Sequence, residues 1–195
     1  MFGTGSIHLG ENTLVGAHCT LLVGYAPDDP DVPARGLVIG DRCVIGAGSI
    51  LTAHSCIEIG DDVWFGRDVF VSDASHGYQD PETPIGLQLG AHQPVRVGAG
   101  TWVGHGAIIL PGASIGRNVV VGAGSVVRGE IPDHAVVAGV PAKVVRRLEP
   151  GLGWVGSRTD DVRPAWTTAE VAAMMAGSQD SERSQVQASA PTQSS

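Results

Sequence analysis

The sequence predicts an all-β fold, a parallel β-helix of about five three-sided coils with inserted loops. Aliphatic residues recur at intervals of six, a period that neither an α-helix (3.6) nor an alternating hairpin strand (2) produces. A fixed hexapeptide period is typical of a parallel β-helix. The longest unbroken series is Val97, Val103, Ile109, Ile115, Val121 and Val127.

The residues between the aliphatics support this fold and define its coil. A small or β-branched residue stands four positions after nearly every aliphatic, where the tight corner of a coil leaves little internal width; examples are Cys19, Cys43, Ser49, Val63, Thr101, Ala107 and Ser125. Glycine follows the first two aliphatics of each triplet but not the third, as in Gly40, Gly46 and Thr52. The three faces therefore differ, and the repeating unit is a coil of 18 residues. We expect glycine at these positions because the backbone must turn between short strands.

Three insertions interrupt the repeat. About twelve extra residues lie between Tyr25 and Gly36, two lie near Ile57 and Glu58, and about twenty follow Val71. Insertions in solenoids form loops, and long loops on a rigid scaffold usually carry function. We therefore expect the functional residues near the longest insertion.

The composition excludes several classes of protein. With 195 residues, 28 glycines and only 5% aromatic residues, the chain suits narrow repetitive packing in one modest core. A net charge of −8 argues against nucleic acid as the main partner. No apolar run is long enough to span a membrane, the N-terminus lacks the features of a signal peptide, and three scattered cysteines form no metal-binding pair. We expect a cytoplasmic protein without a metal site.

Two segments follow from the extent of the repeat. Residues 1–150 form the predicted β-helix domain, and residues 151–195 form a C-terminal extension. In the extension, TTAEVAAMMAG predicts a short helix capped by Thr167 or Thr168. The polar, low-complexity segment after it predicts a disordered tail.

Residues 36–147 also carry a specific resemblance. The segment SDASHGYQDPETPIG, the strand motif TWVG, the turn PGASIGRN and the closing GVPAK resemble the hexapeptide-repeat O-acetyltransferases, most closely the galactoside, maltose and colanic-acid subgroup. The resemblance implies a left-handed β-helix and a homotrimer with active sites at subunit interfaces. It also implies an acetyl-coenzyme A-dependent enzyme that acetylates a hydroxyl of a sugar or glycan.

His76 matches the catalytic histidine of this family. A histidine suits the removal of a hydroxyl proton near neutral pH because its ordinary pKa lies close by. The resemblance thus implies direct attack on the thioester with His76 as general base, and backbone N–H groups of an adjacent coil facing the oxyanion. Asp73, Tyr78, Asp80 or a backbone carbonyl could orient His76, and the plainer alternative is a loop histidine that only fixes a turn.

The same resemblance places the two substrates. Residues at or near coenzyme-contact positions are Trp102, His105, Ala123, Arg128, Lys143 and Arg146. His105 replaces a serine of the galactoside enzyme, and Arg128 stands where the family has a threonine followed by a lysine. His54, close to an acceptor-binding carboxylate of that enzyme, is expected to contact the acceptor with Asp73 and Tyr78, and its change to histidine leaves the acceptor unnamed.

Three other functions remain to be weighed. A zinc enzyme of the carbonic anhydrase type on this fold would need a close pair of histidines that the chain lacks. A non-catalytic β-helix scaffold is compatible with the fold, because a fold does not fix a function. Acyl transfer to an amino sugar is the alternative to hydroxyl transfer within the family.

Overall fold

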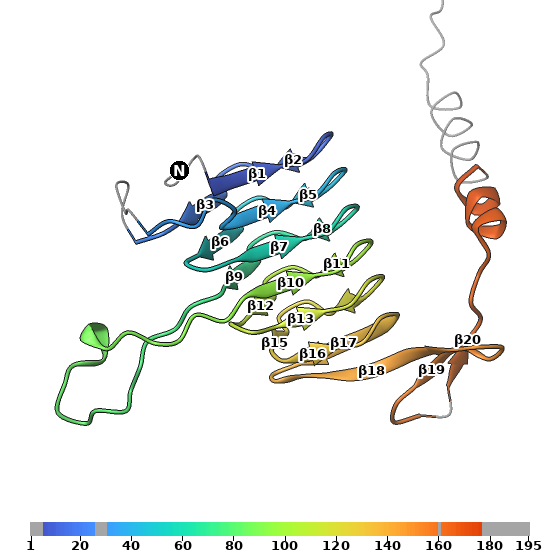
Figure 1. The fold of residues 1–195 in the computed structure, drawn as a ribbon. Coiled ribbons are helices and arrows are strands. Elements are labelled where there is room, and N and C mark those ends of the chain that lie inside the picture. The colour runs from blue at the N-terminus through green and yellow to red at the C-terminus, as the bar shows by residue number, and fades with distance from the viewer. Residues whose placement is uncertain (1–5, 26–30, 160, 177–195) are drawn as a thin grey trace, which may run out of the picture.

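The computed structural model describes residues 6–25, 31–159 and 161–176. The predicted left-handed parallel β-helix is confirmed (Figure 1). Its first face holds β1 (Ile7–Leu9), β4 (Leu37–Ile39), β7 (Ile57–Ile59), β10 (Val95–Val97), β13 (Ser114–Ile115) and β16 (Glu130–Ile131). The second holds β2 (Leu14–Val15), β5 (Val44–Ile45), β8 (Trp64–Phe65), β11 (Trp102–Val103), β14 (Val120–Val121) and β17 (Ala135–Gly139). The third holds β3 (Thr20–Val23), β6 (Ile50–Ala53), β9 (Phe70–Ser72), β12 (Ile108–Ile109) and β15 (Val126–Val127).

The described strands make five complete coils, and β16 and β17 begin a sixth. The predicted aliphatics point inward: Ile45, Val103, Ile109 and Val121 are fully buried. The predicted corner residues are buried as well, among them Cys43, Ser49, Val63, Ala107 and Ser125. Leu9 and Val15 are 47% and 36% exposed, because among the described residues the first coil has a neighbouring coil on one side only.

The glycines after the aliphatics are required for a different reason from the one predicted. Gly46 does not have a positive φ; the positive values fall two residues later, at Gly48 and at corner residues such as Arg42 and Asn118. A Cβ on Gly46 would instead lie 2.1 Å from the carbonyl oxygen of Gly66 in the next coil. Glycine is therefore needed because a neighbouring backbone approaches closely, not because the chain turns there.

All three predicted insertions lie at the corner where the third face leads into the first, between β3 and β4, β6 and β7, and β9 and β10. The first follows β3, and the structure describes its residues up to Tyr25 and again from Asp31. The long loop of residues 73–94 joins β9 to β10 and projects from the body of the prism (Figure 1). It contains a short 3₁₀ helix, η2 (Ile85–Leu87), and an antiparallel bridge between His76 and Leu89.

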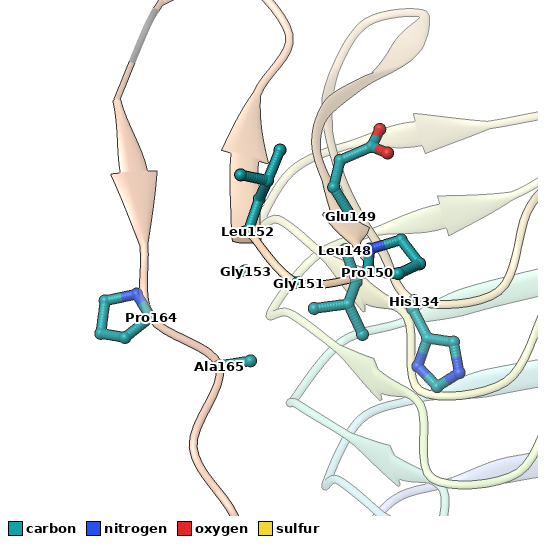
Figure 2. Close-up of a pocket in the computed structure, with 9 residues that line it drawn as sticks. All are labelled: His134, Leu148, Glu149, Pro150, Gly151, Leu152, Gly153, Pro164 and Ala165. Carbon is teal, nitrogen blue, oxygen red and sulfur yellow. The ribbon is translucent and has the colours of Figure 1, made fainter.

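Beyond β17 the chain leaves the coil and extends the sheet of the second face with antiparallel strands: β18 (Ala142–Glu149), β19 (Gly153–Gly156) and β20 (Val162–Arg163). Residue 150 lies in the turn between β18 and β19, so the strands on either side of the predicted division pair with each other. A cavity of about 670 Å³ opens beside this turn, and its lining includes His134, Leu148, Glu149, Leu152 and Pro164 (Figure 2).

The predicted C-terminal helix is confirmed over residues 168–176. Thr167 is its cap: its Oγ1 accepts the backbone N–H of Glu170 at 3.3 Å, and the Glu170 carboxylate accepts the backbone N–H of Thr167 at 2.7 Å. This reciprocal pair is a capping box. The predicted disordered tail, residues 178–195, lies outside the described residues. Across the described ranges, no helix has the length and apolarity that crossing a membrane requires.

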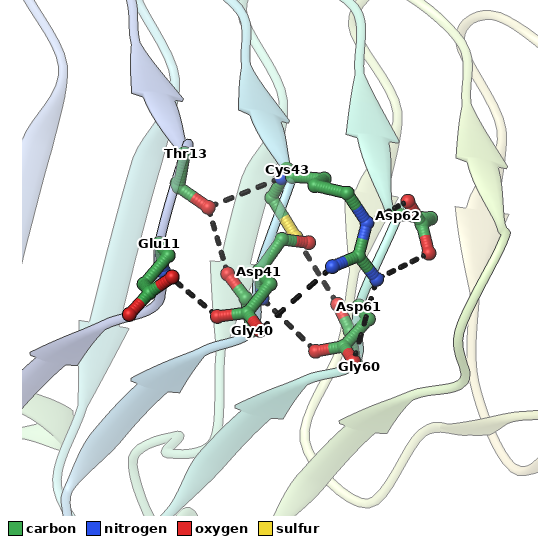
Figure 3. A network of polar contacts seen from close by, with 9 residues as sticks. Glu11, Thr13, Gly40, Asp41, Cys43, Gly60, Asp61 and Asp62 are labelled. Carbon is green, nitrogen blue, oxygen red and sulfur yellow. Dashed lines mark hydrogen bonds and ion pairs between the residues drawn. The ribbon is translucent and has the colours of Figure 1, made fainter.

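A ladder of carboxylates holds the corner between the first and second faces (Figure 3). Asp41 accepts the backbone N–H of Glu11 at 2.7 Å, and Asp61 accepts that of Asp41 at 2.9 Å. Arg42 donates two hydrogen bonds to the Asp62 carboxylate, and this pairing lowers the pKa of Asp62. Each coil thus supplies a carboxylate that accepts a hydrogen bond from a backbone N–H of the coil before it.

Candidate functional site

His76 lies at the start of the long loop, where the regular coil ends. Its Nδ1 is 3.3 Å from the carbonyl oxygen of Gln88, and its backbone pairs with Leu89 across the loop. Of the predicted orienting groups, the structure therefore places a backbone carbonyl beside the ring. With the proton on Nδ1, directed at this carbonyl, Nε2 is left as the basic nitrogen.

The three side chains predicted as alternatives lie elsewhere. Asp73 is fully buried, and its carboxylate accepts the backbone N–H groups of His54, Ser55 and Cys56 at 2.7–2.8 Å. Tyr78 is 77% exposed. Asp80 accepts hydrogen bonds from the Thr83 hydroxyl and the Glu82 backbone, which lower its pKa. Asp73 thus holds the backbone of residues 54–56 in place and does not orient the His76 ring.

His76 and His54 line the same cavity, of about 130 Å³. The other lining residues are Tyr25, Ser72, Ala74, Ser75, Leu89 and Gly90. The cavity lies at the corner between the third and first faces, since it joins the end of β9, the segments after β3 and β6, and the long loop. The structure therefore brings together the predicted base and one predicted acceptor residue, with Asp73 behind it.

The electrostatic feature of this cavity is the pair of His54 and Asp73. His54 Nδ1 lies 3.7 Å from Asp73 Oδ1, and the His54 side chain is 15% exposed. Among the described residues, His54 Nδ1 is the one buried side-chain nitrogen or oxygen without a hydrogen-bond partner. Such an atom needs an explanation, because an unpaired buried polar group costs free energy.

Sequence analysis did not identify Tyr25 and His92 as site residues. The Tyr25 ring centroid lies 4.3 Å from that of His54 and 5.9 Å from that of His92. The Tyr25 hydroxyl and His92 Nε2 are 2.6 Å apart. The available signal was their position: Tyr25 opens the first insertion and His92 closes the longest one.

Three predicted coenzyme residues lie across the second face and the corner that follows it. Trp102 pairs in register with Trp64, and both are more than half exposed. His105 occupies the corner between the second and third faces, with its Nδ1 3.7 Å from Asp68 Oδ2. Ala123 lies one coil further along the same corner, where the Gly124 N–H donates to the His105 carbonyl at 2.9 Å. His105 and Ala123 are therefore stacked.

The three predicted cationic residues lie further apart. Arg128 is exposed in the turn after β15, and Lys143 is exposed on β18 opposite Ala138. The Arg146 guanidinium is already bonded to the Asp161 carboxylate and to the Trp154 carbonyl. None of the six predicted coenzyme residues lines the cavity of His76.

The described residues allow metal-binding groups and thiols to be compared with the imidazoles of the cavity. In the described parts of the chain, no group of three or more His, Cys, Asp or Glu side chains is arranged to hold a metal ion. The buried thiol of Cys43 is not a candidate nucleophile, because burial raises its pKa. A pair of imidazoles in one cavity can instead accept protons or hydrogen bonds from an acceptor.

Comparisons with known proteins agree with this fold. A model of the bacterial transferase hexapeptide repeat matches residues 94–129, and one of the hexapeptide repeat of succinyl-transferase matches residues 36–66. A hexapeptide-repeat acetyltransferase of Vibrio cholerae, solved with acetyl coenzyme A, has a TM-score of 0.59 and 28% identity, covering 73% of this chain and 71% of that one. An N-acyltransferase of Bacillus cereus was solved with dTDP and coenzyme A; it has a TM-score of 0.63 and 23% identity, covering 76% of this chain and 77% of that one. At this identity, the likeness supports the fold and not a shared activity.

Relatives in sequence carry the comparison further. An Escherichia coli protein whose name describes a lipopolysaccharide biosynthesis O-acetyl transferase is 33% identical over 151 residues, 73% of this chain and 72% of its own length. A probable acetyltransferase of Mycobacterium tuberculosis is 34% identical over 165 residues, 85% of this chain. The match spans 49% of that longer relative, about half its length.

Proposed function

Because the chain belongs to the hexapeptide-repeat acetyltransferase family, we propose that it transfers an acetyl group from acetyl-coenzyme A to a hydroxyl of a sugar or glycan. The observation that carries the proposal is the placement of His76, whose Nδ1 faces the Gln88 carbonyl while the ring lines a cavity shared with His54. The name of the Escherichia coli relative supports a hydroxyl acceptor.

In the proposed reaction His76 is the general base. Its Nε2 removes the proton of the acceptor hydroxyl as the hydroxyl oxygen attacks the carbonyl carbon of the thioester. The tetrahedral intermediate then collapses, the carbon–sulfur bond breaks, and the imidazolium returns its proton to the leaving thiolate. Backbone N–H groups of an adjacent coil face the oxyanion.

The proposed coenzyme groove runs along the corner between the second and third faces. His105 and Ala123 are stacked there, so the pantetheine arm can lie along two successive coils. Arg128 and Lys143 are exposed and supply positive charge for the phosphates, which an acidic protein needs locally. Arg146 contributes to coenzyme binding indirectly. Its guanidinium is paired with Asp161, and this ion pair holds the hairpin of β18 and β19 in place.

A homotrimer explains how the two substrate regions meet. His76 lies at one edge of the third face, whereas His105 and Ala123 lie at its other edge and do not line the cavity of His76. A second copy that places its corner of His105 and Ala123 beside the first copy's His76 completes the site.

The outward side chains of the faces support this assembly. Partly exposed apolar residues cover the second and third faces, namely Trp64, Trp102, Ile50, Phe70 and Ile108. The first face instead carries the ion pair of Glu58 and Arg96. Exposed apolar surface of this extent marks a contact with another protein surface, whereas a charged face suits solvent.

Labelled acetyl-coenzyme A tests the proposal directly. The purified chain is incubated with simple glycosides, with matched amino sugars, and with no acceptor, and products are identified by mass spectrometry and NMR. We expect label in an ester of the glycosides. Label found only in amides would establish the N-acyl alternative, and coenzyme A binding without transfer to any acceptor would favour a scaffold. Analytical ultracentrifugation gives the oligomeric state in the same samples.

A further inference from the structure

The corner between the second and third faces carries a column of residues, one from each complete coil. The column consists of Ala17, Ala47, Arg67, His105 and Ala123. Backbone hydrogen bonds connect its neighbours: the Gly106 N–H donates to the Arg67 carbonyl at 2.9 Å, as the Gly124 N–H donates to the His105 carbonyl. Arg67 is therefore stacked on His105, on the side opposite Ala123.

The tryptophan of the proposed coenzyme groove is also repeated in the coil of Arg67. Trp64 pairs in register with Trp102, and the two are 58% and 54% exposed. Each tryptophan precedes its corner residue by three positions, so Trp64 and Arg67 repeat the arrangement of Trp102 and His105. The groove proposed for coenzyme A thus continues one coil beyond the residues that the family resemblance indicates.

The Arg67 side chain is available to a ligand. Arg67 is exposed, and within the described ranges its guanidinium takes part in no hydrogen bond or ion pair. The carboxylate of the next residue, Asp68, lies instead beside His105, at 3.7 Å from its Nδ1. Other arginines of the prism and the hairpin are paired with carboxylates, namely Arg42, Arg96, Arg117 and Arg146.

The position of Arg67 separates the two kinds of anionic group that an acyl-coenzyme A can carry, its phosphates and a carboxylate on its acyl group. Arg128, proposed above for the phosphates, follows β15, two coils and roughly 10 Å from Arg67 at the usual spacing of strands. His76 follows β9, and Arg67 precedes β9 in the same coil. In a homotrimer of parallel prisms, rotation keeps equal coils at equal height. Arg67 of the partner subunit then lies at the height of His76, near the thioester and away from the phosphates.

A tryptophan and an arginine side by side suit a short chain that ends in a carboxylate. The indole offers apolar surface to methylene groups. A guanidinium binds a carboxylate through charge-assisted hydrogen bonds, often two at once. On a chain with a net charge of −8, an anionic acyl group needs such a local cation.

We propose that Trp64 and Arg67 form a subsite for the acyl group of the donor, and that the enzyme transfers a dicarboxylic acyl group such as succinyl as well as acetyl. This inference rests on the proposed function, including the homotrimer. The step is the same for both donors: the acceptor oxygen bonds to the thioester carbon, the carbon–sulfur bond breaks, and the acceptor proton passes through His76 to the leaving thiolate. The free carboxylate of the acyl group stays bound to Arg67 and takes no part in the chemistry.

Two four-carbon donors test the subsite, because succinyl- and butyryl-coenzyme A differ only at the end of the acyl chain. Both are compared with acetyl-coenzyme A on the simple glycoside that is acetylated best, with melting curves to check folding of each variant. We expect wild type to prefer succinyl to butyryl by about ten- to a hundredfold in kcat/KM, the scale of one hydrogen bond to a charged group. Arg67→Gln should lose this preference, and Arg67→Lys should keep part of it. Arg96→Gln is the control, since Arg96 is an exposed cation of the first face, and it should keep the preference in full.

Acetyl transfer by wild type without a preference for succinyl over butyryl would overturn the acyl subsite and leave the proposed function intact. Equal losses on all three donors in Arg67→Gln would also overturn it, because they would assign Arg67 to a phosphate. Absence of transfer from any donor to any glycoside or amino sugar would instead overturn the proposed function, and this inference with it.

A binding measurement separates the acyl group from the phosphates without turnover. Isothermal titration calorimetry compares free coenzyme A with the succinyl and butyryl thioesters, in the absence of an acceptor. In Arg67→Gln we expect the Kd of succinyl-coenzyme A to rise at least about tenfold, and that of free coenzyme A, which lacks the carboxylate, to rise much less. Trp64→Ala should weaken both four-carbon thioesters, since their methylene groups are common to both. A matching rise for free coenzyme A in Arg67→Gln would contradict the acyl subsite, whatever the kinetics show.

Discussion

Two corners of the same prism use their residues differently. At the corner between the first and second faces, Asp41 and Asp61 repeat one contact from coil to coil, and each carboxylate satisfies the backbone before it. At the corner between the third and first faces the repeat is broken by insertions, and His54 Nδ1 is left buried without a hydrogen bond. Where the repeat is kept, the residues stabilise one another; where it is broken, the side chains of His54 and His76 line a cavity.

The largest effect is expected from a substitution at the corner between the third and first faces, and it should change activity but not stability. His76→Ala should lower kcat by about 10²- to 10⁴-fold, the contribution typical of a general base. The melting temperature should hardly change, because His76 is exposed and, among the described residues, its ring is bonded to the Gln88 carbonyl alone. Steady-state kinetics and thermal melts of the same preparation measure both.

His18→Asn is the matched control for that variant. His18 is exposed and has a positive φ of 60°, a conformation that asparagine tolerates. It lies in the regular part of the first coil, so both activity and stability should be retained. Near wild-type activity of folded His76→Ala would sink the assignment of the base.

The regular stack should show the opposite pattern, with loss of stability. Gly46→Ala puts a Cβ 2.1 Å from the Gly66 carbonyl oxygen, and both groups belong to backbone that is held by coil-to-coil hydrogen bonds. We expect destabilisation of about 1–3 kcal/mol or more, as for an overpacked core. Gly86→Ala in the long loop is the control, since nothing lies within 4 Å of its Cβ and stability should be unchanged. Equal melting curves for the two variants would show that close stacking does not constrain Gly46.

This contrast explains how much could be predicted from the sequence. The period of six identifies inward residues such as Val103 and corner residues such as Val119, because each depends only on its place in the repeat. The reason for Gly46 could not be derived, since it depends on how closely Gly66 of the next coil approaches. The antiparallel strand β18 also lay outside the six-residue pattern.

Part of the candidate site could likewise be predicted from the sequence, and part could not. His76 could be located because it opens the longest break in the repeat and matches a family motif. The pairing of Tyr25 with His92 depends on the paths of two separate insertions, which no periodicity describes. The role of Asp73 depends on three N–H groups that the previous coil presents, so its spacing from His76 in the sequence was misleading.

A smaller effect is expected from the contact that joins the two insertions. Tyr25→Phe removes the hydroxyl that lies 2.6 Å from His92 Nε2 but keeps the ring against His54. One hydrogen bond is worth about 0.5–1.5 kcal/mol, so KM for the acceptor should rise roughly two- to tenfold. His92→Gln should have a comparable effect, and the double variant should be little worse than either single one. Additive losses would show that the two side chains act separately.

The smallest effect belongs to the regular corner and depends on pH. The Asp133 carboxylate accepts hydrogen bonds from the backbone N–H and the side chain of Arg117, and these lower its pKa from the ordinary value of 3.8. A carboxyl whose pKa is lower in the folded state contributes stability above its unfolded value, and this contribution is lost as pH falls through the folded value. Asp133→Asn should therefore melt slightly below wild type at pH 7, and the difference should shrink as the pH falls below 3.8 and through the lowered pKa of folded Asp133. Because Asp133 and Arg117 are exposed, the shift in melting temperature should also shrink in high salt. A difference that persists unchanged in acid would mean that the carboxylate charge contributes nothing at this corner, and that the shape of the side chain alone holds the turn.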